Sequence, residues 1–165
     1  MLLLSVRIHV GNAIAQSAQP IISYNYGLGD HRRVVDTERL ALLSALGCGT
    51  IVTLAFIIFP RGMVSLFLSP DTEAAAIAVE GFPVFSAALI FFIFNLTAIG
   101  YFQSVKKVKA SIIFALLRGA VFMIPSYIVM PKLLGVKGIW LALGVSEFLT
   151  SLCIAAYYFR HRVAK

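Results

Sequence analysis

Two ionisable residues stand deep inside apolar stretches of the sequence, where a charge is costly unless it is paired. Arg118 lies nine residues after Lys109 and is the only charge before the next lysine. Glu147 lies thirteen residues before Arg160 and is likewise alone in its run. If the two runs are antiparallel helices, these residues lie about 13 Å and about 19 Å from the same end, a difference that extended side chains span. We therefore predict an ion pair between Arg118 and Glu147; the alternative is that nearby backbone or amide groups satisfy each one.

Four amide side chains could also place polar atoms inside or beside apolar runs. Asn95 lies in the middle of its run, and Gln103 is about 80° further around the same predicted helix. A buried amide either contacts a bound molecule or ties two helices together, and the second role is the commoner one. The candidate pathway or helix-tie residues are Gln19, Asn25, Asn95 and Gln103.

Two prolines are candidate hinges. Pro20 and Pro125 each free the carbonyl four residues earlier, which is a point where a helix can bend. Pro125 also shares a seven-residue spacing with Ser111 and Arg118, so that the three lie on one stripe of a regular helix. We expect this stripe to be a kinked packing face that looks into a bundle; the alternative is that it lines a pathway.

A further carboxylate, Glu80, stands just before Gly81 and Pro83. A carboxylate is favoured in the first turn of a helix by the helix dipole, and proline is tolerated there. We therefore expect Glu80 to open its helix as a cap at the membrane interface.

The elements that must position these side chains follow from the composition. Apolar residues make up 60% of the 165-residue chain and charged residues 13%, and the mean hydropathy is +0.93. Soluble domains are nearer half apolar and a quarter charged, so lipid is the expected surrounding. The net charge of +7 is distributed between apolar runs instead of gathering on one polar face, which argues against nucleic-acid binding.

Four runs are long enough to cross a hydrocarbon core of about 30 Å as helices. A fifth run, at the N-terminus, carries Arg7 and His9 and has no clear cleavage site. We interpret it as the end of a membrane helix whose beginning is missing, in preference to a signal peptide. The sequence thus predicts an all-α integral membrane protein, a polytopic bundle with the end of one helix plus four full transmembrane helices. The expected spans are 5–26 (partial), 38–60, 79–105, 110–131 and 138–159.

The basic residues between the spans alternate in number from one side to the other. Nine lie on one side, three lie on the other, and two more lie within the spans. The positive-inside tendency predicts that the richer side is cytoplasmic. The nine are Arg32, Arg33, Arg39, Lys106, Lys107, Lys109, Arg160, Arg162 and Lys165, and the three are Arg61, Lys132 and Lys137.

Small residues recur at every fourth position in two of the runs, a spacing typical of helices whose backbones pack closely in lipid. They are Ala45, Gly49 and Thr53 in the first run and Gly138, Ala142, Ser146 and Thr150 in the last. Patterns of catalysis or metal binding are lacking: the cysteines, Cys48 and Cys153, are isolated, and the histidines have no ligand partners at a suitable spacing. We expect no enzyme activity, no metal site and no cofactor.

The residues Ala18 to Val34, AQPIISYNYGLGDHRRV, resemble the multidrug and toxic compound extrusion (MATE) transporters, in which a helix ending in QPI…NYG runs into a basic loop. The likeness continues in the same order along nearly the whole chain. It includes GYFQ at 100–103, Leu117-Arg118 followed by Pro125, and GIWLA at 138–142 followed by Ser146-Glu147.

This resemblance implies a twelve-helix antiporter of two six-helix lobes, which exports cationic or amphipathic compounds in exchange for Na⁺ or H⁺. The chain would supply the end of the eighth helix and helices nine to twelve of the C-terminal lobe. Its implied partners are the lipid bilayer of the plasma membrane, the missing N-terminal lobe and small organic cations as substrates. Two alternatives remain open, a lipid-linked saccharide flippase of related fold and a membrane scaffold or remnant that transports nothing.

Overall fold

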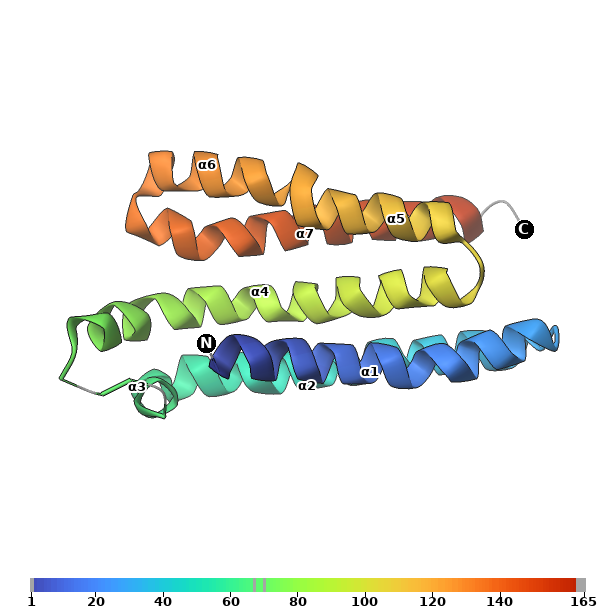
Figure 1. The fold of residues 1–165 in the computed structure, drawn as a ribbon, viewed down its shortest axis with the longest axis horizontal. Coiled ribbons are helices and arrows are strands. Elements are labelled where there is room, and N and C mark those ends of the chain that lie inside the picture. The colour runs from blue at the N-terminus through green and yellow to red at the C-terminus, as the bar shows by residue number, and fades with distance from the viewer. Residues whose placement is uncertain (1, 67, 70, 163–165) are drawn as a thin grey trace.

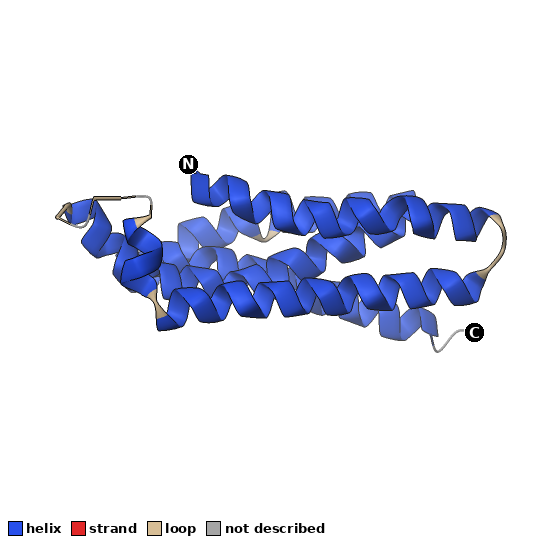
Figure 2. Cartoon of the chain, turned by 90° about the horizontal axis from the view of Figure 1, so that it is seen from below, coloured by secondary structure: helices blue, strands red, loops and turns tan. Residues whose placement is uncertain are grey.

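The structure is a computed structural model that describes residues 2–66, 68–69 and 71–162. Within this part of the chain every regular element is helical (Figure 2). Their order along the chain is α1 (Leu2–Gly27), α2 (His31–Ile58), α3 (Pro60–Ser65), α4 (Glu73–Ser104), α5 (Val108–Leu116), the π-helical η1 (Leu117–Val121), α6 (Met123–Leu134) and α7 (Val136–Arg162).

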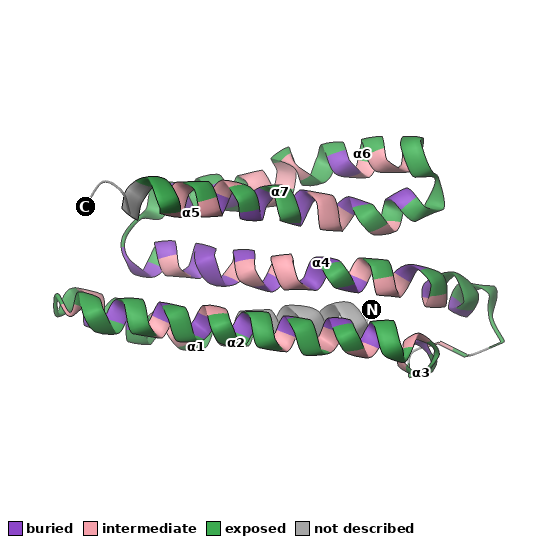
Figure 3. Ribbon diagram, turned by 180° about the vertical axis from the view of Figure 1, so that it is seen from behind, coloured by how far each residue is buried: buried purple, intermediate pink, exposed green. Residues whose placement is uncertain are grey.

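Helix α4 is the centre of the bundle (Figure 1). It packs against α1 and α2 on one side and against α5 and α7 on the other, while α6 packs on α7. Its buried residues therefore extend around much of its circumference, whereas α2 buries a narrow stripe (Figure 3). The helices that surround α4 are held in place largely through it.

Short polar residues and glycines set the turns between the long helices. Asp30 caps α2 by accepting a hydrogen bond from the Arg33 backbone amide at 3.1 Å. Gly29 before it has φ +76°, and Gly135 between α6 and α7 has φ +60°, conformations that glycine adopts without steric cost. The turn thus follows close after the expected end of the first span at residue 26, and it reverses the chain direction between α1 and α2.

Among the described residues, four helical stretches are long and apolar enough to cross a bilayer: His31–Ile58, Glu73–Ser104, Val108–Leu134 and Val136–Arg160. Large apolar side chains cover their outer surfaces, among them Leu40 at 67% exposed and Ile51 at 69%. In water such a surface would be strongly unfavourable, so its natural solvent is lipid. The all-α membrane bundle expected from the sequence is confirmed.

The helices differ in detail from the expected spans. Residues 5–26 lie within α1, which packs against α2 and α4, and the side chains of Arg7 and His9 lie outside the described residues. The second and third spans begin earlier than expected, at His31 and Glu73, because both helices extend beyond their apolar runs. The short helix α3, which the sequence did not predict, follows α2 directly and packs on α4.

The expectation that Glu80 opens its helix is wrong. Helix α4 begins at Glu73, and Thr72 caps it by accepting a hydrogen bond from the Ala75 amide at 3.2 Å. Glu80 lies two turns further in and forms an exposed ion pair with Lys137 of α7, Nζ to Oε1 3.3 Å. The sequence did not reveal the helix start at Thr72 because the residues before Glu80 are mostly alanine. Alanine favours a helix in water and in lipid alike, so hydropathy shows no boundary at Thr72.

The small-residue stripes lie where the helices meet. Gly49 approaches the backbone of Ile90 in α4 so closely that an added Cβ would stand 3.2 Å from its Cα. Thr53 donates a hydrogen bond to the Ser86 carbonyl at 2.8 Å, again between α2 and α4. In α7, Ala142, Ser146 and Thr150 are fully buried. The small residues of these stripes therefore allow α2 and α7 to pack closely against the neighbouring helices.

The stripe of Ser111, Arg118 and Pro125 is broken by a π-helical turn. The Phe122 amide donates to the Leu117 carbonyl, five residues back, at 2.9 Å. This turn inserts one residue into the helical register and rotates the subsequent helix, α6, by about 100°. As a result Ser126 is buried and Pro125 is exposed, so the prediction that Pro125 faces the bundle is wrong.

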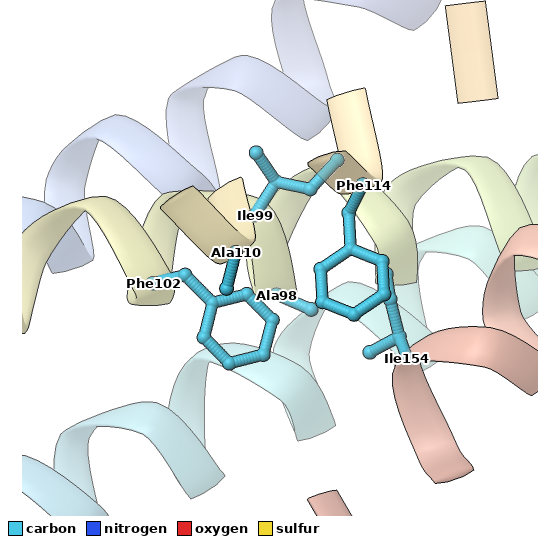
Figure 4. Close-up of a cluster of buried hydrophobic side chains, with 6 residues drawn as sticks. All are labelled: Ala98, Ile99, Phe102, Ala110, Phe114 and Ile154. Carbon is cyan, nitrogen blue, oxygen red and sulfur yellow. The ribbon is translucent and has the colours of Figure 1, made fainter. Parts of the chain in front are cut away.

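An apolar cluster joins α4, α5 and α7 near the turn at 105–107 (Figure 4). Phe102 and Phe114 stack with their ring centroids 5.4 Å apart, and Ile154 of α7 packs with them in the cluster. The other members are Ala98, Ile99 and Ala110. Because Phe114 is one turn before Arg118 and Ile154 is two turns after Glu147, this cluster fixes the relative height of the two helices that carry the charges.

Candidate functional site: a buried polar cluster

The two charges singled out in the sequence lie together in the middle of the bundle. Arg118 Nε is 2.8 Å from Glu147 Oε1. The Glu147 side chain is 3% exposed and that of Arg118 is 18% exposed. Since their surroundings exclude water, each charge depends on the other for most of its stabilisation.

Asn95 of α4 completes the coordination of Glu147. Its Nδ2 donates to Glu147 Oε2 at 2.8 Å and to the Glu147 main-chain carbonyl at 2.9 Å. Its Oδ1 accepts a hydrogen bond from Ser151 Oγ at 2.9 Å. Both carboxylate oxygens of Glu147 therefore have a donor, and the cluster joins η1, α4 and α7.

The π-helical turn presents Arg118 to this cluster. Arg118 is the second residue of η1, and its guanidinium carbon lies 4.1 Å from the centroid of the Phe92 ring on α4. A guanidinium over an aromatic face gains electrostatic attraction from the ring. The turn and the ring together hold the cation against α4 while its Nε reaches α7.

The cluster can act as a polar clamp at the depth where the bilayer is most apolar. Apart from this cluster, the buried contacts among η1, α4 and α7 are made by apolar and small residues. A change in the protonation or pairing of Arg118 and Glu147 would therefore alter the packing of all three. Among the described residues, no group of three histidine, cysteine, aspartate or glutamate side chains is arranged to hold a metal ion.

Replacing Asn95 with leucine is expected to destabilise the bundle by about 1–3 kcal/mol, because Glu147 Oε2 and Ser151 Oγ would each lose a buried partner. The loss can be measured by unfolding the protein in detergent and following the fluorescence of Trp140, the single tryptophan. Thr50→Val is the matched control, since the exposed Thr50 hydroxyl bonds only within its own helix, to the Leu46 carbonyl. Equal stability of the two variants would contradict the role of Asn95 in joining α4 to α7.

The remaining amides predicted from the sequence lie elsewhere. Gln19 Nε2 is 3.5 Å from Gln103 Oε1, a long contact between α1 and α4 that lies outside the buried cluster. Asn25 is buried, but its Nδ2 donates back to the Ile21 carbonyl of its own helix at 2.8 Å. Pro20 lies inside α1, which continues through it to Gly27. These residues thus do not converge with Arg118 and Glu147.

The aromatic side chains of α4 mostly contact α7. Phe82 and Phe85 lie edge-on to Trp140, with centroids 5.5 and 5.9 Å from it, and Phe91 packs on Phe148 at 5.3 Å. The three α4 rings are half-buried. These rings therefore pack between α4 and α7 instead of forming a surface that faces lipid.

A polar contact between α2 and α7 was not predicted from the sequence. Glu38 of α2 is 9% exposed and accepts a hydrogen bond from the Tyr158 hydroxyl of α7. A signal for it was present, because Glu38 is in phase with the buried positions Ala41 and Ala45 of the same helix. Helical periodicity, applied to polar as well as small residues, places it on the packing face.

The fold and the buried polar cluster define a polytopic helical membrane protein whose interior carries a charge pair. The sequence model of the family described as MatE matches residues 1–129, from α1 into α6. The chain therefore belongs to the MatE family, whose members are helical membrane transporters and not enzymes, and the resemblance seen in the motifs is confirmed. No match was found among curated proteins or among solved structures.

Proposed function

We propose that this chain forms most of the C-terminal lobe of a multidrug efflux antiporter that exports cationic or amphipathic compounds in exchange for Na⁺ or H⁺. The observation that carries the proposal is the MatE family match across the membrane helices, residues 1–129. In this proposal the side rich in basic residues faces the cytoplasm of the plasma membrane, in accordance with the positive-inside tendency.

The bundle has the character of a lobe that moves as one body. Alternating access in transporters of two halves is largely a rocking of one bundle against the other around a central site. The α4-centred packing and the clamp of Asn95, Arg118 and Glu147 support such a rigid unit. A second six-helix lobe would supply the other wall of the pathway.

The charge distribution favours export of cations over the flipping of lipid-linked saccharides. A flippase needs uncompensated positive charge in its cavity to hold an anionic headgroup. Arg118 is the one cation that the described spans place deep in the bundle, and Glu147 neutralises it. The guanidinium is therefore poorly suited to hold a second anion.

Efflux of ethidium from cells without other exporters tests this proposal. The chain is produced alone and together with the complementary N-terminal half of a MatE transporter, which ends within the eighth helix, and that half is also produced alone. We expect lower ethidium accumulation only when both halves are present. Proteoliposomes with an imposed Na⁺ or pH gradient then identify the coupling ion.

If both halves reach the membrane and ethidium still accumulates as in cells without them, the export proposal is wrong. A chain that is folded and membrane-embedded, yet inactive with its partner lobe, would instead fit the scaffold alternative. The gradient experiment has its own control, because dissipating both gradients must abolish any concentrative flux.

A further inference from the structure

A groove of about 670 Å³ lies between α2 and α7, with α4 at its base. The hydrogen bond from Tyr158 of α7 to Glu38 of α2 bridges the two walls. The volume is in the range of sites that hold small organic molecules. Its lining includes Asp36, Arg39, Leu42, Leu46, Phe94 and Phe159.

The groove changes from charged to apolar along α2. Its charged residues, Asp36, Glu38 and Arg39, lie in the first three turns after the α1–α2 connection, and leucines line the following turns. From Asp36 to Leu46 the helix rises about 15 Å, which is half of a hydrocarbon core of about 30 Å. The groove therefore has the length and polarity gradient of a single leaflet.

Both signs of charge meet at the polar end. Asp36 and Arg39 are exposed, and the carboxylate of Glu38 is held in place by Tyr158. A ligand with an ammonium and a phosphate can pair with both. An organic cation without a phosphate can pair with the carboxylates but leaves Arg39 without an anion, and an anionic lipid meets two carboxylates for one guanidinium.

We propose that this groove binds one zwitterionic phospholipid with a primary ammonium, a phosphatidylethanolamine, in the leaflet on the side of the α1–α2 turn. The phosphate pairs with Arg39, the ammonium donates to Asp36 and Glu38, and one acyl chain follows Leu42 and Leu46 toward Phe94. A guanidinium is well suited to phosphate, and an ammonium donates strong charge-assisted hydrogen bonds to carboxylates. The site is independent of the proposed export activity.

Native mass spectrometry of the purified chain in detergent tests this site, with phosphatidylethanolamine, phosphatidylcholine and phosphatidylglycerol of identical acyl chains. We expect one phosphatidylethanolamine to bind about ten-fold more tightly than either competitor. The quaternary ammonium of phosphatidylcholine cannot donate a hydrogen bond, and one such bond to a carboxylate accounts for about this ratio. Equal affinities for the three lipids, or preference for phosphatidylglycerol, would overturn the proposal.

Three variants of exposed residues on α2 separate the contributions. Asp36→Asn should abolish most of the preference for phosphatidylethanolamine over phosphatidylcholine, and Arg39→Gln should weaken both lipids alike because both carry the phosphate. Arg32→Gln, a cation of the same helix outside the groove lining, should change neither. An Asp36→Asn protein that keeps the full preference, or an Arg32→Gln protein that loses it, refutes the assignment.

Tetraphenylphosphonium is the probe for the competing occupant. It carries a positive charge on an apolar body and has no phosphate. The lipid proposal is wrong, and the groove is a cation site, if three results occur together. Binding of tetraphenylphosphonium requires Asp36 and is strengthened by Arg39→Gln. It also displaces phosphatidylethanolamine, and the protein binds phosphatidylethanolamine no more tightly than phosphatidylcholine. If it fails to displace phosphatidylethanolamine, the lipid assignment is supported, whatever the outcome of the efflux assay.

Discussion

Replacing Arg118 with glutamine is expected to lower the free energy of unfolding by roughly 3–5 kcal/mol, because Glu147 would remain charged and buried without its cation. Glu147→Gln should have an effect of similar size for the opposite reason. The Arg118→Gln/Glu147→Gln double variant should be less destabilised than the sum of the two, since neither charge is left alone. The reversed pair, Arg118→Glu/Glu147→Arg, should recover part of the loss.

The measurement is an unfolding titration in detergent followed by Trp140 fluorescence. Trp140 is a suitable probe because it lies against Phe82 and Phe85 at the α4–α7 contact. Lys137→Gln is the matched control, since it breaks the exposed pair with Glu80 and should cost less than about 1 kcal/mol. If Arg118→Gln costs no more than this control, or if the reversed pair recovers nothing, the buried pair does not stabilise the bundle.

Gly138→Ala is expected to destabilise the packing of α6 on α7 by about 3 kcal/mol or more, since overpacking of a rigid site typically costs about 1–3 kcal/mol and occasionally more. An added Cβ would stand 2.0 Å from the Met130 carbonyl oxygen and 2.4 Å from its carbonyl carbon. Both are main-chain atoms, so no side-chain rotation can relieve the clash, and the two helices must separate.

The control for this variant has the opposite expected sign. Gly47 lies on the exposed side of α2, and nothing stands within 4 Å of an added Cβ. Gly47→Ala should therefore be neutral or stabilise the protein by up to about 1 kcal/mol, because alanine is the better helix former. Thermal unfolding followed by circular dichroism compares the two. A Gly138→Ala protein as stable as Gly47→Ala would show that α6 and α7 are not held at this distance.

Much of the fold was readable from apolar run lengths and small-residue spacing. Gly49, Thr53, Ala142 and Ser146 are buried where the fourth-residue pattern puts them, because close helix contacts in lipid require small side chains. The extension of α4 to Glu73 was not readable, since an alanine-rich segment supports a helix outside the bilayer as well as inside it.

The sequence by itself determined the membrane bundle and the similar depth of Arg118 and Glu147, because the bilayer thickness and the helical rise fix how far each residue lies from its loop. Only the tertiary structure decided which helices are neighbours. That is why the partner of Asn95, which is Glu147, the partner of Glu38, which is Tyr158, and the groove beside this second contact emerge from the packing alone. The π-helical turn that exposes Pro125 was also decided only by the tertiary structure, because a one-residue change of hydrogen-bond register leaves the hydropathy of the sequence unaltered.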